Sequence, residues 1–331
     1  MNAHELYTKL PLRFRNGKYR ILMISDFQEG LENDGRTLAC IDRLIDHTSP
    51  DLVVLGGDIC HGDRIKTADE LEKYLTVFTS PMEKRGIPWC NVFGNHDHDV
   101  PLPDGDIQAV YESFPHCVSK HEDGITGETN FVLPVLSSDG SRIAYAVWGL
   151  DSNNLISDAG FPAGALRDGE SEYDGFSETV RPINAARWDI VHFDQLMWYY
   201  NTSVELEKYA GHKVNGFLAV HIAPWEFQYL VDNPEITGTV GTKDETMSLG
   251  RFNSGLFAAV LQRGDIKCIG SGHSHEDSFD GVFCGIRCCM DACAGCNCYG
   301  LDEIRGGRVI DIDESDTSRV STYMVAYKDI M

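Results

Sequence analysis

Short apolar runs alternate with amphipathic segments along the first third of the chain. The runs are rich in branched side chains and predict buried strands at 19–25, 52–55 and 89–93. Between them, apolar residues recur at helical spacing and predict helices at 38–47 and 68–78, the second of them capped by Thr67. Strand, helix, strand, helix, strand is the order of βαβ units, so we expect an α/β fold built on a mainly parallel sheet.

The remainder of the chain is less regular but continues the same mixture of elements. Residues 131–136 and 142–148 predict paired strands around a Ser-Asp-Gly turn. Residues 151–187 are rich in Gly, Asp, Ser and Asn without a clear period, which predicts a long loop or a small insertion. No linker or internal repeat interrupts the sequence, so we expect one domain spanning 1–331. Further elements are predicted as helices at 194–209 and 254–262, strands at 217–220 and 266–269, and strand-like segments from Arg308 onward.

Composition sets limits on the function. The 331 residues contain 28 Lys and Arg against 51 Asp and Glu, a formal net charge of −23 with a pI near 4.8. So strong a negative charge repels phosphate backbones and argues against a duplex nucleic-acid partner. No apolar run approaches the ~20 residues that a membrane span requires, and the first residues lack the pattern of a signal peptide. The 11 cysteines, an odd number, fit reduced thiols, so we expect a soluble, cytoplasmic protein with no membrane partner.

Metal-type ligands follow directly after five of the apolar strands. In a mostly parallel sheet, groups that follow strand carboxyl ends converge along one edge, where the ligand sites of α/β proteins lie. Any one of these residues alone is more often a helix cap, a turn former or a satisfied core histidine, but five such segments in order are hard to attribute to chance. Together they make a mixed oxygen and nitrogen shell that suits Zn, Mn or Fe rather than Ca. The residues are Asp26, Asp58, Asn95, His221, His273 and His275.

The order of these motifs resembles that of the calcineurin-like metallophosphoesterase superfamily. Along the chain it runs Asp-x-Gln, Gly-Asp, Gly-Asn-His-Asp, His and Gly-His-x-His. Segments 81–89, 195–206, 253–255 and 263–265 are similar to the Dcr2-like, purple-acid-phosphatase-related branch. The resemblance covers most of the chain and is weakest over 100–187. It implies a four-layer α/β/β/α sandwich of two mixed sheets flanked by helices.

The resemblance also implies a centre of two metal ions, either divalent cations or ions of the Fe, Zn or Mn type. Two cations ~3.5–4 Å apart clamp a phosphoryl group and activate a water for in-line attack. His96 would lie beside the phosphate, as general acid to the leaving oxygen or as a charge donor. Asp97 would orient His96 through a hydrogen bond, or would only stabilise the turn. The implied ligands are Asp26, Asp58 and His275 at the first metal, with Asp58 bridging, and Asn95, His221 and His273 at the second.

The chain departs from the family pattern at the first metal. Gln28 stands where the family usually has a histidine, and an amide oxygen is a weaker ligand for borderline metals than imidazole. His61 stands where the purple branches carry a ligand tyrosine, so no purple colour is expected. His61 either replaces the missing imidazole or is a solvent-facing loop histidine. The Asp-Arg-Gly extension of the Ser/Thr protein phosphatases is missing after Gly-Asp, which argues against that subgroup.

Six cysteines within fifteen residues form a second candidate cluster. The spacing of Cys293 and Cys296 is typical of zinc sites, and so many thiols are also typical of iron–sulfur sites. The family, however, places buried strands in this segment, where a cysteine packs as a small apolar residue. Both interpretations stay open. The six are Cys284, Cys288, Cys289, Cys293, Cys296 and Cys298.

We therefore expect a metal-dependent phosphoesterase that hydrolyses phosphate esters, either small molecules or phosphoproteins, with a two-metal-activated water. A phosphodiesterase acting on cyclic nucleotides or nucleic-acid ends is the alternative among enzymes, because the same centre serves both reactions. A catalytically weakened, metal-binding regulatory module is the alternative from another class. Gln28 motivates that alternative, and the retention of His96 argues against it. The glycine-rich nucleotide-binding motifs are missing from the sequence.

Overall fold

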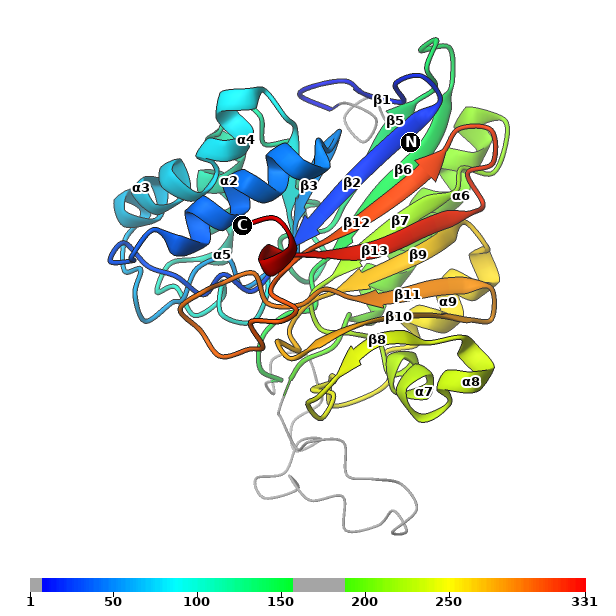
Figure 1. Ribbon diagram of the computed structural model, residues 1–331. Coiled ribbons are helices and arrows are strands. Elements are labelled where there is room, and N and C mark those ends of the chain that lie inside the picture. Colours follow the sequence, from blue (N-terminus) through cyan, green and yellow to red (C-terminus); the bar gives the residue numbers. More distant parts are fainter. Residues whose placement is uncertain (1–7, 157–187) are drawn as a thin grey trace, which may run out of the picture.

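A computed structural model of the chain describes residues 8–156 and 188–331, so most of the insertion predicted at 151–187 lies outside the described residues. Within them, the strands form two sheets that pack face to face, and helices lie on the outer side of each sheet (Figure 1). No helix in these two ranges is both long enough and apolar enough to cross a membrane.

The five-stranded sheet carries the amino-terminal βαβ units. Its strand order is β13-β12-β2-β3-β4, with β2, β3 and β4 parallel and β12 and β13 antiparallel. Helices α2 to α5, blue to cyan in Figure 1, lie beside it. The strands are β2 (Lys18–Ile24), β3 (Leu52–Leu55), β4 (Trp89–Asn91), β12 (Gly306–Asp313) and β13 (Val320–Ala326), and the helices are α2 (Arg36–Thr48), α3 (Ala68–Phe78), α4 (Ser80–Arg85) and α5 (Asp104–Ser113).

The eight-stranded sheet has the order β1-β5-β6-β7-β9-β11-β10-β8. Its central strands β6, β7, β9 and β11 are parallel, and antiparallel pairs flank them. Four helices and one short 3₁₀ turn complete the described fold. The strands are β1 (Leu12–Arg13), β5 (Phe131–Leu136), β6 (Ile143–Leu150), β7 (Gly216–Val220), β8 (Val240–Lys243), β9 (Ile266–Ser271), β10 (Asp277–Phe283) and β11 (Ile286–Met290), and the helices are α6 (Phe193–Ala210), α7 (Glu226–Asp232), α8 (Pro234–Thr237), α9 (Leu256–Arg263) and η2 (Tyr327–Asp329).

Three apolar cores separate the four layers. Along β2, Leu22 packs into the core beneath α2 and α3, whereas its neighbour Ile21 faces the core between the sheets. A third core, around Trp148, lies between the eight-stranded sheet and its helices. Successive side chains of a strand point to opposite faces, so a strand buried on both faces has to be apolar throughout. The layers form the α/β/β/α sandwich of two mixed sheets that the sequence predicts.

The hydrophobic pattern locates the strongest elements well. Three predicted segments, 52–55, 68–78 and 131–136, coincide with β3, α3 and β5. Thr67 caps α3 as predicted, since its side chain accepts a hydrogen bond from the Glu70 N–H at 3.2 Å. Helix α5 and the hairpin of β10 and β11 are not predicted by the pattern. The first of these lies in the region where the family resemblance is weakest.

Candidate metal centre

The residues that the sequence singles out lie at one edge of the two sheets. They follow the carboxyl ends of β2, β3 and β4 in one sheet and of β7 and β9 in the other. Strand β4 ends at Asn91, two residues earlier than predicted, because the chain turns toward this edge and the Phe93 N–H donates to Thr129 Oγ1. Every one of the predicted ligands is buried: Asp26, Gln28, Asp58, Asn95, His221, His273 and His275.

The backbone is strained where these side chains turn inward. Positive φ values of 58°, 47°, 52° and 72° occur at Asp26, Gln28, Asp58 and His273. Residues other than glycine rarely adopt this left-handed region, and those that do cluster at functional sites, where the surrounding structure enforces the strain. The loops after β2, β3 and β9 are thus shaped to direct polar side chains toward one point.

We call Asp58, Asn95, His221 and His273 the second half of the site. Ligand atoms of its aspartate and two histidines lie within 4.8 Å of one another. The His221 ring contacts the Gly56 carbonyl through Nδ1 at 2.8 Å, which leaves Nε2 at 3.4 Å from Asp58 Oδ2. Among the described residues, no hydrogen-bond partner reaches the buried His221 Nε2, His273 Nε2 or Asn95 Oδ1. Buried polar atoms are nearly always paired, so these unpaired atoms fit a bound cation.

We call Asp26, Gln28, Asp58 and His275 the first half. The two carboxylates and the imidazole again offer atoms within 4.8 Å of one another, and His275 Nε2 lies 3.3 Å from Asp26 Oδ1. Gln28 Nε2 lies 3.1 Å from both Asp58 Oδ2 and His275 Nε2. The amide thus lies between the ligands, and it would have to rotate to present Oε1 to a metal ion. His275 Nδ1 contacts the Tyr299 carbonyl at 2.9 Å.

Buried carboxylates and histidines influence one another's pKa values in both halves. Burial alone would raise the pKa of Asp58, but His221 holds that pKa well below its usual range. Burial lowers the pKa of His221 and of His275, yet the neighbouring carboxylates outweigh it and raise these pKa values to about 9 and about 11. Burial and the His221 charge lower the pKa of His273 to about 3, so that ring is neutral. A metal ion would take the place of the protons on His221 and His275.

His96 and Asp97 lie beside the two halves. The backbone N–H of His96 donates to Asp58 Oδ1 at 2.8 Å. The His96 ring contacts Asp99 Oδ2 through Nδ1, also at 2.8 Å. The Asp97 carboxylate accepts hydrogen bonds from the backbone N–H groups of Asp58 and Gly94, each at 2.8 Å. Of the two roles expected for Asp97, these contacts favour the stabilisation of the turn, because the carboxylate joins the loops after β3 and β4. Asp99 holds the imidazole instead.

Gly94 allows those two loops to touch. A Cβ at this position would collide with the Asp58 carboxylate. Glycine before Asn95 is therefore needed for a close approach between loops. Gly57, before Asp58, is needed for the turn itself, because its φ is +100°.

His61 lies against His96 and not in either half of the site. The two ring centroids are 4.6 Å apart and the rings are tilted by only 20°. His61 Nδ1 accepts a hydrogen bond from the Asp63 N–H at 3.3 Å. Of the groups of potential ligands in the described ranges, none includes His61. The idea that it replaces the missing imidazole thus gains no support, and His61 restricts the His96 ring instead.

Three residues that contact the site are not singled out by the sequence analysis. The Trp188 ring meets the His273 ring edge-on, with centroids 4.9 Å apart. The Tyr299 ring stacks on His275 at 4.0 Å, with only 8° between the planes. Both contacts join segments far apart in the sequence. Only Asp99, three residues after His96, has a spacing that could have indicated its contact.

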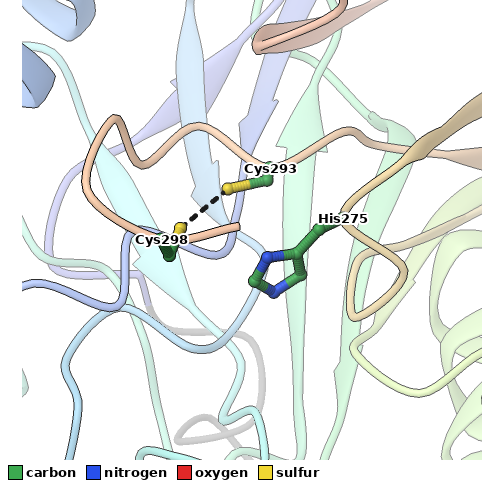
Figure 2. Close-up of side chains that lie close together, drawn as sticks. All are labelled: His275, Cys293 and Cys298. Carbon is green, nitrogen blue, oxygen red and sulfur yellow. Dashed lines mark hydrogen bonds between the residues drawn. The ribbon is translucent and has the colours of Figure 1, made fainter. Parts of the chain in front are cut away.

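The cysteines at 284–298 do not form a single cluster. Cys284 is exposed, and the two cysteines in β11 are buried among apolar residues, as the packing interpretation expects. Cys293 and Cys298 have sulfur atoms 3.0 Å apart, and a ring nitrogen of His275 lies within 4.8 Å of both (Figure 2). This pair lies directly behind a predicted metal ligand.

Sequence comparison identifies the family of the chain. The profile of the calcineurin-like phosphoesterase family matches residues 19–277, so the chain belongs to that family and to the hydrolases that act on phosphate esters. A protein of Arabidopsis thaliana named "Probable inactive purple acid phosphatase 14" is 26% identical over 328 residues, covering 89% of this chain and 75% of that one. Phosphatase DCR2 of Saccharomyces cerevisiae is 25% identical over 147 residues, covering 38% of this chain and 25% of that one. The resemblance noted in the sequence is confirmed.

Structural comparison agrees on the fold. A dimetal phosphatase from Danio rerio superimposes with a TM-score of 0.56, covering 92% of this chain and 98% of that one at 12% identity. At so low an identity the likeness shows the fold alone. The two halves of the candidate site therefore have to be judged on this chain's own residues.

Proposed function

We propose that the chain is a metal-dependent phosphoesterase that hydrolyses phosphate esters with a water activated by two metal ions. One observation carries the proposal: buried ligand atoms, without hydrogen-bond partners in the described ranges, converge at the edge where five strands end. Their mixture of carboxylate, amide and imidazole suits Mn, Fe or Zn. The residues that would hold the ions are Asp26, Asp58 and His275 in the first half and Asp58, Asn95, His221 and His273 in the second.

When bound, two metal ions would polarise the phosphoryl oxygens and activate a water for in-line attack. Asp58 would belong to both halves, and the His96 N–H and Asp97 keep its carboxylate and its loop in place. The contact with Asp99 through Nδ1 leaves His96 Nε2 to give a proton to the leaving oxygen. The stacked ring of His61 limits the rotation of His96 and so favours this geometry.

Metal removal tests the proposal. Hydrolysis of an aryl phosphate should disappear after exhaustive chelation and return with Mn, Fe or Zn. Calcium should restore little, because the ligand set is not all oxygen. Full activity in metal-free protein would contradict the two-metal mechanism.

A catalytically weakened metal-binding module is the second candidate. Two facts favour it: the Gln28 amide lies 3.1 Å from two ligands of the first half, and the Arabidopsis relative reported above carries the word "inactive" in its name. A panel of phosphomonoesters, phosphodiesters and phosphopeptides separates the candidates. Metal binding without turnover on any of them would support the module, whereas turnover would support the enzyme and define its substrate class. The cytoplasmic location stays a prediction.

A further inference from the structure

The loop between β11 and β12 brings two thiols together behind the first half of the site. Cys293 Sγ and Cys298 Sγ lie 3.0 Å apart (Figure 2). Cys293 is buried and Cys298 is half-buried, so Cys298 is the more exposed residue of the pair. Both sulfurs also approach the Asp26 carbonyl oxygen, at 3.1 and 3.6 Å. Neither belongs to the ligand set proposed for the phosphoesterase centre.

The surroundings argue against a third metal ion at this pair. A tetrahedral zinc ion with Zn–S bonds of about 2.3 Å holds two thiolates roughly 3.8 Å apart, farther than the distance observed. The Arg305 guanidinium donates to Cys293 Sγ from Nη1 at 3.1 Å, and its charge would repel a cation. His275 Nδ1 already contacts the Tyr299 carbonyl, and its Nε2 faces Asp26. The arrangement favours sulfur–sulfur chemistry.

We propose that Cys293 and Cys298 are an oxidation site, where a hydroperoxide converts the two thiols into a reversible disulfide. The Cys298 sulfur attacks one peroxide oxygen, the O–O bond breaks, and an alcohol or a water leaves, so that Cys298 becomes a sulfenic acid. The Cys293 sulfur then attacks the Cys298 sulfur, the S–O bond breaks, and the hydroxyl leaves as water with the Cys293 thiol proton. Two thiols and one hydroperoxide thus yield one disulfide, one water and one alcohol or second water. A dithiol reductant reverses the reaction.

Oxidation would act on a ligand of the first half. Tyr299 follows Cys298 directly, its carbonyl contacts His275 Nδ1 at 2.9 Å, and its ring stacks on the His275 ring. Drawing the sulfurs from 3.0 Å to a bond length of about 2.05 Å shifts the backbone that holds this imidazole. Loss of such support typically weakens metal binding 10–100-fold. This consequence rests on the proposed function, whereas the disulfide itself does not.

Differential alkylation of the full-length protein tests the disulfide. The protein is treated with hydrogen peroxide, unfolded in denaturant so that every free thiol is blocked with one alkylating reagent, then reduced and labelled with a second. Trypsin cleaves after Arg287 and Arg305, so peptide 288–305 holds both thiols and fragment ions locate each label. We expect the second label at Cys293 and Cys298 alone, and its loss when dithiothreitol follows the peroxide.

Matched variants decide whether the pair is specific. Cys293→Ser and Cys298→Ser should each abolish the disulfide. Cys268→Ser should leave it intact, although the buried Cys268 and Cys289 sulfurs are only 3.7 Å apart. If Cys293 and Cys298 both carry the first alkylating reagent after peroxide treatment, no disulfide has formed between them and the proposal is overturned. Zinc that protects both thiols from alkylation would also overturn it, in favour of a metal site.

Metal titrations of the reduced and the oxidised protein test the coupling to the first half. We expect one of two metal ions to bind at least tenfold more weakly after oxidation, with recovery after dithiothreitol. Unchanged metal binding in the disulfide form would overturn the coupling. If the chain binds no metal, neither form would respond to the titration, and the alkylation result would still decide the disulfide on its own. If it binds metal without turnover, both the coupling and the disulfide are still tested.

Discussion

The two halves of the site share Asp58 but differ in what surrounds their other ligands. In the second half, three buried ligand atoms have no hydrogen-bond partner among the described residues: His221 Nε2, His273 Nε2 and Asn95 Oδ1. In the first half, the Gln28 amide lies within 3.1 Å of two ligands, and of its described ligand atoms only Asp26 Oδ1 is unpaired. The ring and the carbonyl of Tyr299 also contact His275, and the sulfur atoms of Cys293 and Cys298 lie close to its ring.

This difference predicts unequal metal binding. An unpaired buried polar atom costs free energy unless something binds it, so the second half gains most from a cation. In the first half, the Gln28 amide already lies among the ligands, and it has to rotate before its Oε1 can face a cation. We expect the second half to fill at lower metal concentration than the first.

The largest effect is expected at Asp58, because it serves both halves. Asp58→Asn keeps the size of the side chain but removes a negative charge that both metal ions would share. Phosphatase activity should fall to background, and both ions should be lost from the protein as measured by elemental analysis. Asp63→Asn, an exposed carboxylate on the neighbouring loop, is the matched control and should retain both ions. Retention of two ions by Asp58→Asn would mean that the halves do not share this residue.

His96→Ala should have the next largest effect. If His96 protonates the leaving oxygen, kcat should fall by roughly 10²–10⁴, the usual range for a positioned acid or base. Metal content should stay unchanged in both halves, because the His96 ring contacts Asp99 and not a ligand atom. Asp99→Asn keeps the ring but removes the negative charge beside its Nδ1, so its kcat should fall between those of wild type and His96→Ala. Loss of metal in His96→Ala would place His96 in one of the halves.

The strand ends could be predicted from the sequence, but the contacts around them could not. Segment 52–55 predicts its strand because both faces are buried and an unbroken apolar run marks such a strand. Asp58 follows it directly, so position along the chain was enough to place this ligand at the edge of the sheet. The same reasoning placed Asn95 and the three histidines at this edge, whereas Gln28 was singled out only by the family resemblance.

The partners of those ligands depend on packing between distant segments. Tyr299 reaches His275 across a loop, and Trp188 reaches His273 from outside the strands altogether. Neither contact has a local spacing that a sequence could display. The family resemblance left two roles open for Asp97, and its carboxylate accepts backbone N–H groups, as the turn-stabilising role expects. A residue three positions along the turn, Asp99, reaches the ring instead.

Gln28 variants should change the metal affinity of the first half alone. Gln28→His restores an imidazole and should tighten that half for Zn or Fe, whereas Gln28→Ala should loosen it. A lost contact of this kind typically costs on the order of 1–3 kcal/mol, or about ten- to a hundredfold in affinity. Calorimetric titration of metal into the three metal-free proteins should show one altered site and one constant site. If wild type and Gln28→Ala give the same two isotherms, Gln28 is no ligand.

The smallest effect is a difference in how pH acts on the two halves. Burial lowers the pKa of both His221 and His275, but the carboxylates beside them raise the values to about 9 and about 11. A metal ion has to displace each proton, so affinity in both halves should fall about tenfold for each unit that the pH drops below these values. Above pH 9 the second half has no His221 proton left to lose, and His273, with a pKa of about 3, adds none. Its affinity should therefore level off, while that of the first half still rises. Titrations at pH 7, 8, 9 and 10 measure both slopes, and an affinity that stays constant from pH 7 to 9 in both halves would show that neither imidazole holds a proton that metal displaces.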